Sequence, residues 1–483
     1  MELLKNRNII FSIALLFMGL NTYFIIKDNF IFSAFPIILL LLYIGLFHIR
    51  TAFLLVIFFT PLSINIEEFT DIDLGLFLPT EPLLFGLMLL AIFKQTLSPS
   101  LPKSFWKNPI VISVGFYLFW TLITTITSVL PIVSAKFLLM KLWYLIPIFF
   151  IGHNFFQEKS AIAKLLWSYT LSMTGVIIFT LIKHYGYSFA EREGHWVMFP
   201  FFKDHTIYGS SVVINLFFIL GLLSYKRHKL YIYLVLILMT AITVIGLYFS
   251  YTRAAWLSVI FALGVWLLIR FRIKFRYLLV ILLLIISVLV SSWHEIEIAL
   301  SKNKYEHTTT NFEERIQSSA NFTSDASNLE RINRWEAAYL MYQEKPIFGF
   351  GPATYAFEYA PYQRPENLTI ISTNFGDNGN AHSEFLGPLA EMGLIGMLAI
   401  IFFVTSLFTI GIKLLINLKR NFPEEKDLYY LILALVLANS SYFFHGLINN
   451  YLDTDKASIP IYCSAIIFIV FQQKFQKKKI ADK

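Results

Sequence analysis

Runs of apolar residues recur along the whole sequence, and many are close to the ~20 residues that a helix needs to cross a hydrocarbon core. Hydrophobic residues make up 57% of the chain and charged residues 14%, which excludes a water-soluble globule. The runs are continuous rather than alternating, which excludes an outer-membrane β-barrel. The sequence therefore predicts an all-α polytopic membrane protein with about 12–14 transmembrane helices. The expected spans are 9–26, 31–48, 51–64, 79–93, 109–127, 137–156, 165–183, 207–224, 230–248, 255–270, 277–292, 384–415, 428–447 and 458–472.

Lysine and arginine residues are concentrated in alternate connections between these spans, for example around Arg50, Arg227 and Arg272. The positive-inside rule places such connections and both termini in the cytoplasm, so the remaining connections face outward. Lys5 and Arg7 precede the first apolar run, and no small-residue cleavage site follows, which favours a retained helix over a signal peptide. Because the basic residues lie in short loops and form no single face, nucleic-acid binding is excluded.

One outward connection is far longer than the others. It divides the chain into transmembrane helices over 1–292, a polar loop over 293–383 that we expect to be catalytic, and C-terminal transmembrane helices over 384–483. Long loops in otherwise compact proteins tend to carry function. Within the loop, Ser327 and Glu330 fit a capping box, so an amphipathic helix is expected over 329–344.

Two arginines on that helix are candidate binding residues. Arg331 lies beside the apolar stripe of the helix, and Arg334 lies about 60° further round. A helix on the outer membrane boundary would direct Arg331 along the surface, where a lipid-linked phosphate would lie. The alternative is an interfacial helix whose arginines snorkel or pair with Glu330 and Glu336. The expected stripe consists of Ile332, Trp335, Tyr339 and Tyr342.

The next segment, 346–352, contains two glycines that permit a tight turn with close backbone approach. No Lys-Ser/Thr pair follows, so the segment is not a nucleotide P-loop and ATP use is not supported. Cys463 is the only cysteine, so neither an intramolecular disulfide nor a cysteine metal site is available. No cofactor is expected.

His382 ends the long loop, directly before an apolar helix expected from residue 385. The N-terminus of a helix favours an anion, and a neutral imidazole there can accept a proton from a hydroxyl. A structural hydrogen-bonding role for His382 is the alternative. Glu391, about two turns deeper, is a costly carboxylate within a span, which indicates a polar partner or a functional role.

Arg253 lies at the outward turn between two long apolar runs, and bidentate binding of a phosphate would satisfy its charge. With Arg331 or Arg334 it would form a two-arginine clamp for a pyrophosphate, whereas snorkelling to headgroups is the alternative. His205 and Lys136, in other outward regions, are further candidates for substrate binding. The loop pairs Asp71/Asp73 and Asp453/Asp455 are best explained as solvated charge, so no metal site is assigned.

Four segments follow one another over residues 250–396, about a third of the chain. They are 250–257 (SYTRAAWL), 331–335 (RINRW) continuing through 344–351 (EKPIFGFG), 381–386 (AHSEFL) and 391–396 (EMGLIG). In this order they resemble the O-antigen ligase and O-antigen polymerase family of bacterial membrane enzymes. Ser383 stands where Asn is common in the family, and Ala254 where Gly is frequent.

The resemblance implies a GT-C-like fold and a site on the periplasmic face of the bacterial inner membrane. By that resemblance Arg253 and Arg331 hold the pyrophosphate of an undecaprenyl-linked donor. His382 assists attack by the acceptor, with inversion at the sugar and without a metal. The chemistry is consistent, because two guanidinium groups stabilise the charge that develops on the leaving pyrophosphate.

The leading hypothesis is therefore a ligase that transfers a glycan from undecaprenyl diphosphate to a hydroxyl of lipid A–core. A polymerase, whose acceptor is a second lipid-linked unit, and a protein O-glycosylating transferase are alternatives within the same chemistry. The alternative from another class is a transporter of lipid-linked glycans, which would place ionisable residues at mid-membrane depth on several helices. The expected partners are the lipid-linked donor, the acceptor and the bilayer, with no nucleic acid and no nucleotide.

Overall fold

The computed structural model describes residues 7–27, 31–69, 75–225, 228–271, 326–365 and 379–481, with the single positions 287, 291, 368 and 372. Within this part of the chain almost all regular structure is helical, and the one sheet is a short antiparallel pair, β1 (Ile64–Asn65) and β2 (Phe77–Leu78). Ten of the described helices are long and apolar enough to cross a membrane. The prediction of an all-α polytopic membrane protein is confirmed.

These ten helices coincide with the expected spans from residue 79 onward. The span expected at 277–292 and the loop residues up to 325 lie outside the described residues. The ten helices are α4 (Thr80–Leu97), α6 (Pro109–Ile126), α7 (Pro131–Phe155), α8 (Lys159–Tyr185), α10 (His205–Ser224), α11 (Leu230–Tyr248), α12 (Arg253–Phe271), α18 (Leu386–Asn421), α19 (Lys426–His445) and α20 (Asp455–Ala481). The shorter elements among them are η3 (Ile66–Glu68), α5 (Lys103–Trp106), α9 (Glu191–Gly194), α16 (Ala326–Glu344), α17 (Tyr355–Glu358) and η4 (Ala360–Tyr362).

Of the three N-terminal spans, the first agrees with expectation, whereas the helices of the second and third are shorter than expected. Residues Met1–Phe53 form a compact unit of their own, and Leu54–Lys483 form a second unit. The first unit contains α1 (Arg7–Ile26), η2 (Ile31–Ala34) and α2 (Phe35–Phe47), and α3 (Ile49–Phe59) begins in it. With 11 residues, α3 rises only about 16 Å, roughly half of a hydrocarbon core.

A buried lysine explains how the chain can stop being helical after α3. Lys456 Nζ donates to the carbonyl oxygens of Thr60, Pro61 and Ser63 at 2.8, 3.2 and 2.8 Å. It thereby helps to satisfy buried backbone acceptors, of which the Thr60 oxygen also accepts from Ser63 Oγ at 3.2 Å. The neighbouring Asp455 accepts hydrogen bonds from the hydroxyls of Ser63 and Thr80 at 2.5 Å each. Asp455 therefore has a structural role, and Asp71 and Asp73 lie outside the described residues.

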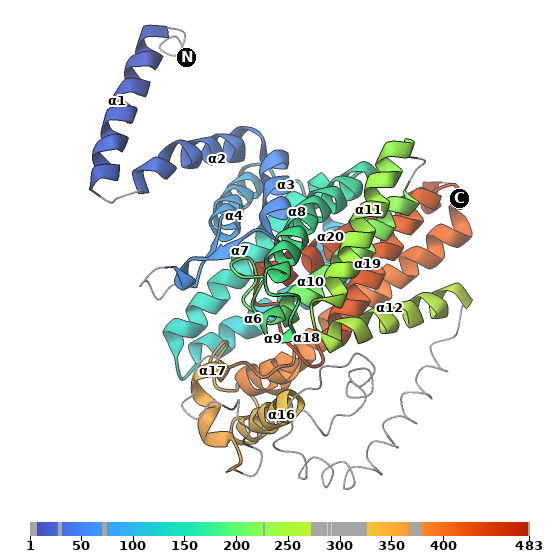
Figure 1. Ribbon diagram of the computed structural model, residues 1–483. Helices are drawn as coiled ribbons and strands as arrows, with labels where there is room; N and C mark the ends of the chain where they lie inside the picture. The colour runs from blue at the N-terminus through green and yellow to red at the C-terminus, as the bar shows by residue number, and fades with distance from the viewer. Residues whose placement is uncertain are drawn as a thin grey trace. The chain divides into compact units, whose positions relative to one another are not determined.

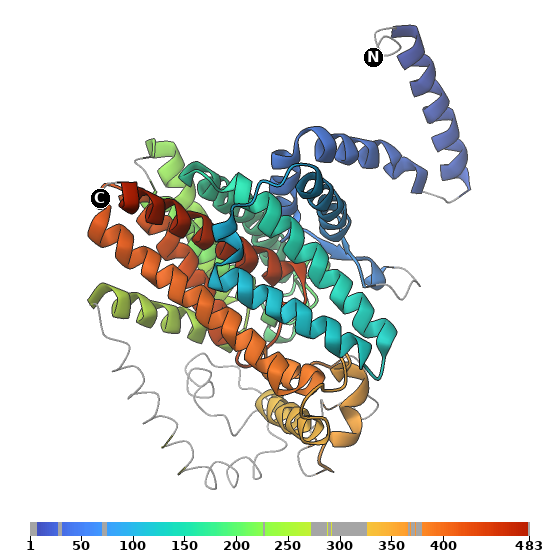
Figure 2. The same cartoon turned by 180° about the vertical axis from the view of Figure 1, so that it is seen from behind.

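Helices α10, α19 and α20 form the centre of the second unit, and 83% of each membrane-length stretch is buried. Figures 1 and 2 show α11 and α12 on one side of this centre and α6 and α7 on the other. The outer helices expose apolar side chains, such as Leu234 and Leu238 of α11, where lipid would contact them. Close packing at the centre depends on small residues, because a Cβ on Gly221 would lie 2.6 Å from Ala434 Cβ.

Helix α18 is broken at Gly393, where φ is +67°. The break lets the segment that contains Pro346 dock against α18. Leu394 N donates to Pro346 O at 3.0 Å. Helix α16 lies across the start of α18, and we call this end of the second unit the α16 end (Figure 1). The other end, where α18 finishes and α20 has its C-terminal part, is the α20 end.

We expect Gly393→Ala to destabilise the protein by about 2 kcal/mol or more. An alanine would need a positive φ, and its Cβ would lie 2.1 Å from Ile347 O. The matched control is Gly264→Ala in α12, where nothing lies within 4 Å of an added Cβ. Thermal unfolding of the detergent-purified variants would measure the difference, and equal unfolding midpoints for the two variants would contradict this account of the break.

Candidate active site

The site is built on α16, which begins at Ala326 and confirms the helix expected over 329–344 within a few residues. Two details differ. Ser327 lies inside the helix, and Glu330 pairs with Arg334 instead of completing a capping box. The buried face carries Ala337, Ala338 and Met341, whereas Tyr339 of the expected aromatic stripe is 51% exposed. Small residues occupy the buried face because α16 packs closely against the start of α18.

Arg334 is held within the protein. Its side chain is 5% exposed, and its Nε donates to Glu330 Oε1 at 2.7 Å. The guanidinium lies 4.5 Å from the centre of the Tyr359 ring and against Gly379. These contacts tie α16 to the segments on either side of it, so the geometry favours a positioning role for Arg334.

The glycine segment 346–352 forms the turn expected from its sequence and docks on the first turns of α18. Gly351 N donates to the backbone oxygen of Glu391 at 2.8 Å, and Phe350 N donates to Ala390 O at 3.2 Å. Gly349 has a φ of +66° and lies against the Glu391 backbone. The Glu391 carboxylate accepts from Tyr355 N at 3.1 Å. The polar partner expected for the Glu391 carboxylate is therefore the backbone at the start of α17.

His382 lies at the start of α18 with a positive φ of 46°. Its backbone is fixed at both polar atoms: the nitrogen donates to Asn380 Oδ1 at 2.9 Å, and the oxygen accepts from Trp335 Nε1 at 3.2 Å. Burial, reinforced by the charges of Arg331 and Arg334, lowers the pKa of the His382 ring to about 3. The imidazole is therefore neutral at physiological pH and has a lone pair available for a proton.

Arg253 and Arg331 come from helices far apart in the sequence, yet their charges interact. Arg253 begins α12, after a turn in which Thr252 Oγ1 donates to His205 O at 2.7 Å. Burial lowers the pKa of the Arg331 guanidinium, whereas the charges of Tyr451 and Asp204 raise it. The structure thus brings together the two arginines that the sequence analysis paired.

His205 begins α10 in the same neighbourhood. Its ring stacks on His195 with 4.3 Å between the ring centres, and the charges of Arg253 and Arg331 act on it. Asp204 is the N-cap of α10 and accepts from Thr206 N at 2.7 Å and from Ile207 N at 3.2 Å. Its carboxylate is the negative charge that acts on both Arg331 and His382.

A segment that the sequence analysis did not assign to the site completes this region. Glu384 Oε1 accepts from Tyr451 N at 2.6 Å, from Leu452 N at 2.9 Å and from the Tyr442 hydroxyl at 2.5 Å. Glu384 N in turn donates to Gly446 O at 2.9 Å. Burial raises the pKa of Glu384 to about 7. The segment 446–452 is therefore bound to the turn that carries His382.

Lys136 is exposed on α7, and its charge acts on Glu81 of α4. The buried lysine of this helix is Lys141, which is 1% exposed and pairs with Asp453 Oδ1 at 2.8 Å. Its Nζ also donates to Leu452 O at 2.7 Å. A cavity of about 20 Å³, enough for a single water, lies beside Lys141, Glu384 and Asn450.

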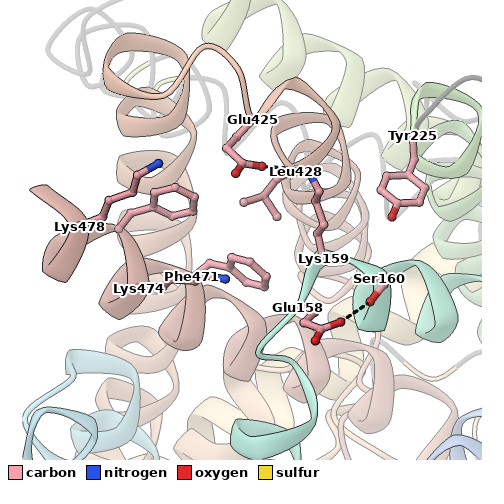
Figure 3. Close-up of a pocket in the computed structure, with 10 residues that line it drawn as sticks. Glu158, Lys159, Ser160, Tyr225, Glu425, Leu428, Phe471, Lys474 and Lys478 are labelled. Carbon is pink, nitrogen blue, oxygen red and sulfur yellow. Dashed lines mark hydrogen bonds and ion pairs between the residues drawn. The ribbon is translucent and has the colours of Figure 1, made fainter.

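A larger pocket of about 400 Å³ lies at the α20 end, and His382 is not among its lining residues (Figure 3). Lys159 points toward Glu425 there, and the two pair at 3.0 Å. The pocket is lined mainly by lysine, glutamate and aromatic side chains. The lining residues are Glu158, Lys159, Ser160, Tyr225, Glu425, Leu428, Phe471, Lys474, Phe475 and Lys478. Over the described ranges, no group of three or more His, Cys, Asp or Glu side chains is placed to hold a metal ion.

With this geometry in place, the comparison with known families is decisive for one stretch of the chain. Residues 235–401 match the family described as O-antigen ligase. The matched stretch contains Arg253, Arg331, His382 and Glu391, whereas His205 and the segment 446–452 lie outside it. No curated protein matches the chain. The expected resemblance is confirmed, and an O-antigen ligase or polymerase type of function follows in general terms.

Proposed function

We propose that the protein is a glycosyltransferase that moves a glycan from undecaprenyl diphosphate to a hydroxyl of a lipid A–core acceptor, with inversion and without a metal. The observation that carries this proposal is the convergence of Arg253, Arg331 and the neutral ring of His382 at the α16 end. Two fixed cations beside one neutral base suit a reaction that expels a diphosphate and removes a proton.

The two arginines would bind the diphosphate of the donor. Each guanidinium can contact phosphate oxygens in a planar, bidentate manner, which a lysine cannot reproduce. Negative charge on the diphosphate increases as the bond to the sugar breaks, so preorganised arginines stabilise the transition state more than the ground state. Arg334, already engaged by Glu330, would support Arg331 through the packing of α16.

His382 would accept the proton of the attacking hydroxyl. The acceptor oxygen forms a bond to the anomeric carbon, and its proton moves to a ring nitrogen of His382. The bond from that carbon to the diphosphate oxygen breaks, and its electron pair leaves with undecaprenyl diphosphate. Binding of the anionic donor next to Arg331 offsets the cations that hold the pKa of His382 low. The base therefore becomes stronger when the substrate is present.

The charge distribution supports placing this site on the periplasmic side of the inner membrane. Lys159, Lys474 and Lys478 surround the pocket at the α20 end, and basic connections of this kind face the cytoplasm. The α16 end, which carries the candidate site, would then face outward. Helix α16 would lie near the lipid headgroups, at the level of a lipid-linked diphosphate.

Identification of the product tests the proposed function. Purified protein would be reconstituted with an undecaprenyl-diphosphate-linked glycan, with either lipid A–core or donor alone. Glycan on lipid A–core is the expected result. Extension of the chain on the lipid carrier would replace the ligase with a polymerase. No transfer to either acceptor would contradict both and leave a protein acceptor or transport.

A further inference from the structure

Asn449 lies between two histidines at the base of the candidate site. It is 2% exposed, and its Nδ2 is 3.3 Å from Nε2 of His445, the last residue of α19. Its side chain also acts on the ring of His382, where it raises the pKa against the effect of burial. Asn449 therefore connects the proposed base to a second, more deeply buried imidazole.

The contact with His445 determines which way the Asn449 amide faces. An amide nitrogen can only donate, so it pairs with the lone pair of His445 Nε2. The amide oxygen then remains for His382, and an oxygen can only accept. A ring nitrogen of His382 that faces this oxygen would carry the hydrogen of the neutral ring, which would leave the lone pair on the opposite nitrogen.

His445 is 1% exposed, and among the described residues its Nδ1 has no hydrogen-bond partner. A buried polar atom without a partner costs free energy, so an apolar residue would be preferred here if packing alone mattered. Holding the Asn449 amide is a role that an apolar residue could not perform.

The backbone around Asn449 is fixed from both sides. Glu384 accepts from the nitrogens of Tyr451 and Leu452 and donates its own nitrogen to Gly446. The Tyr451 hydroxyl also hydrogen-bonds the hydroxyl of Thr206, at the start of α10. The distance between Asn449 and His382 is thus set by contacts that do not involve substrate.

We propose that Asn449 is the positioning residue for His382 and that His445 sets the orientation of the Asn449 amide. This inference rests on the proposed function of His382. The amide oxygen keeps the catalytic lone pair directed away from Asn449 and stabilises the imidazolium that forms when the acceptor loses its proton. Papain-like proteases use an asparagine for the same purpose beside their catalytic histidine.

Several other titratable groups face His382 and affect the pKa of its ring. Arg331 and Arg334 approach from α16, Asp204 from the start of α10, and His445 from α19 through Asn449. The two arginines oppose protonation of His382, and Asp204 favours it. A test must therefore change Asn449 alone and follow the dependence of the rate on pH.

We expect Asn449→Ala to lower kcat about 10- to 100-fold and to leave the KM for the donor unchanged, as is typical when the group that orients a functional histidine is lost. Asn449→Asp would place a carboxylate against the ring and raise the pKa of His382. The base would then be protonated at higher pH, so the acidic limb of the kcat profile should move upward by at least about one pH unit. His445→Phe should also lower kcat, as Asn449→Ala does.

The matched control is Asn450→Ala, one residue along the same segment, whose side chain lines the small cavity beside Lys141. Its kcat and pH profile should stay close to those of the wild type. Thermal unfolding would verify that each variant is folded. Because aspartate has nearly the same shape as asparagine, Asn449→Asp should fold even if Asn449→Ala does not. The positioning role is wrong if folded Asn449→Ala is as active as Asn450→Ala. It is also wrong if Asn449→Asp leaves the acidic limb of kcat unmoved while His382→Gln is inactive. Full activity of His382→Gln would instead overturn the proposed function.

Discussion

Replacing Arg331 with lysine should lower the rate of transfer at saturating donor by about 100-fold or more, although the charge is kept. An ammonium group is a compact charge that cannot contact two phosphate oxygens in one plane as a guanidinium does. The loss should appear mainly in kcat, because the contact strengthens as charge develops on the diphosphate. Initial rates with an undecaprenyl-diphosphate-linked glycan would measure it.

Arg364→Lys is the matched control for this substitution. Arg364 is 55% exposed and pairs with Glu336 at 2.8 Å. Exposed ion pairs of this kind contribute only about 0–1 kcal/mol, so this variant should transfer glycan at nearly the wild-type rate. A wild-type rate for Arg331→Lys would remove Arg331 from the proposed diphosphate clamp.

His382→Gln should lower kcat by about 100- to 10,000-fold, because glutamine can hydrogen-bond the acceptor but cannot take its proton. The wild type should show a characteristic pH dependence. In the free enzyme the pKa of His382 is lowered to about 3, so protonation of this base should not reduce kcat/KM between pH 8 and about pH 5. The bound diphosphate raises that pKa, so the acidic limb of kcat should lie at higher pH than that of kcat/KM.

The control is His228→Gln, in the connection after α10, whose ring nitrogen Nε2 contacts Leu222 O at 2.7 Å. It should retain wild-type rates and pH profiles. Retention of activity by His382→Gln would exclude a base at this position. An acidic limb of kcat/KM near the ordinary histidine pKa would show that burial and the arginines do not control the free enzyme.

The fold class could be predicted because membrane spans are long local patterns. Ten expected spans correspond to helices of sufficient length. The prediction was less accurate for 51–64, where α3 ends at Phe59. That end depends on Lys456, almost 400 residues away in the sequence, and a contact of this kind has no local signature.

Within the site, the sequence indicated Arg253, Arg331 and His382, and the structure brings their charges into one region. It offered the pairing of Arg334 with Glu330 only as an alternative, and it did not indicate that Glu391 accepts from the backbone nitrogen of Tyr355. The sequence analysis also missed Asn449, because its relation to His382 joins residues that are far apart in the sequence. Its importance comes from two histidines on different elements, and the only local signal was the polar pair Asn449-Asn450, which begins four residues after α19 ends at His445.

Release of undecaprenyl diphosphate in a single turnover tests the central claim most directly. Wild type and His382→Ala would be mixed with the lipid-linked donor, with and without lipid A–core and in the presence of a metal chelator. We predict release that requires acceptor, persists with chelator and is lost in His382→Ala, whose abundance and unfolding temperature should match the wild type. Equal release by both proteins, or no release by the wild type with any acceptor, would contradict the account.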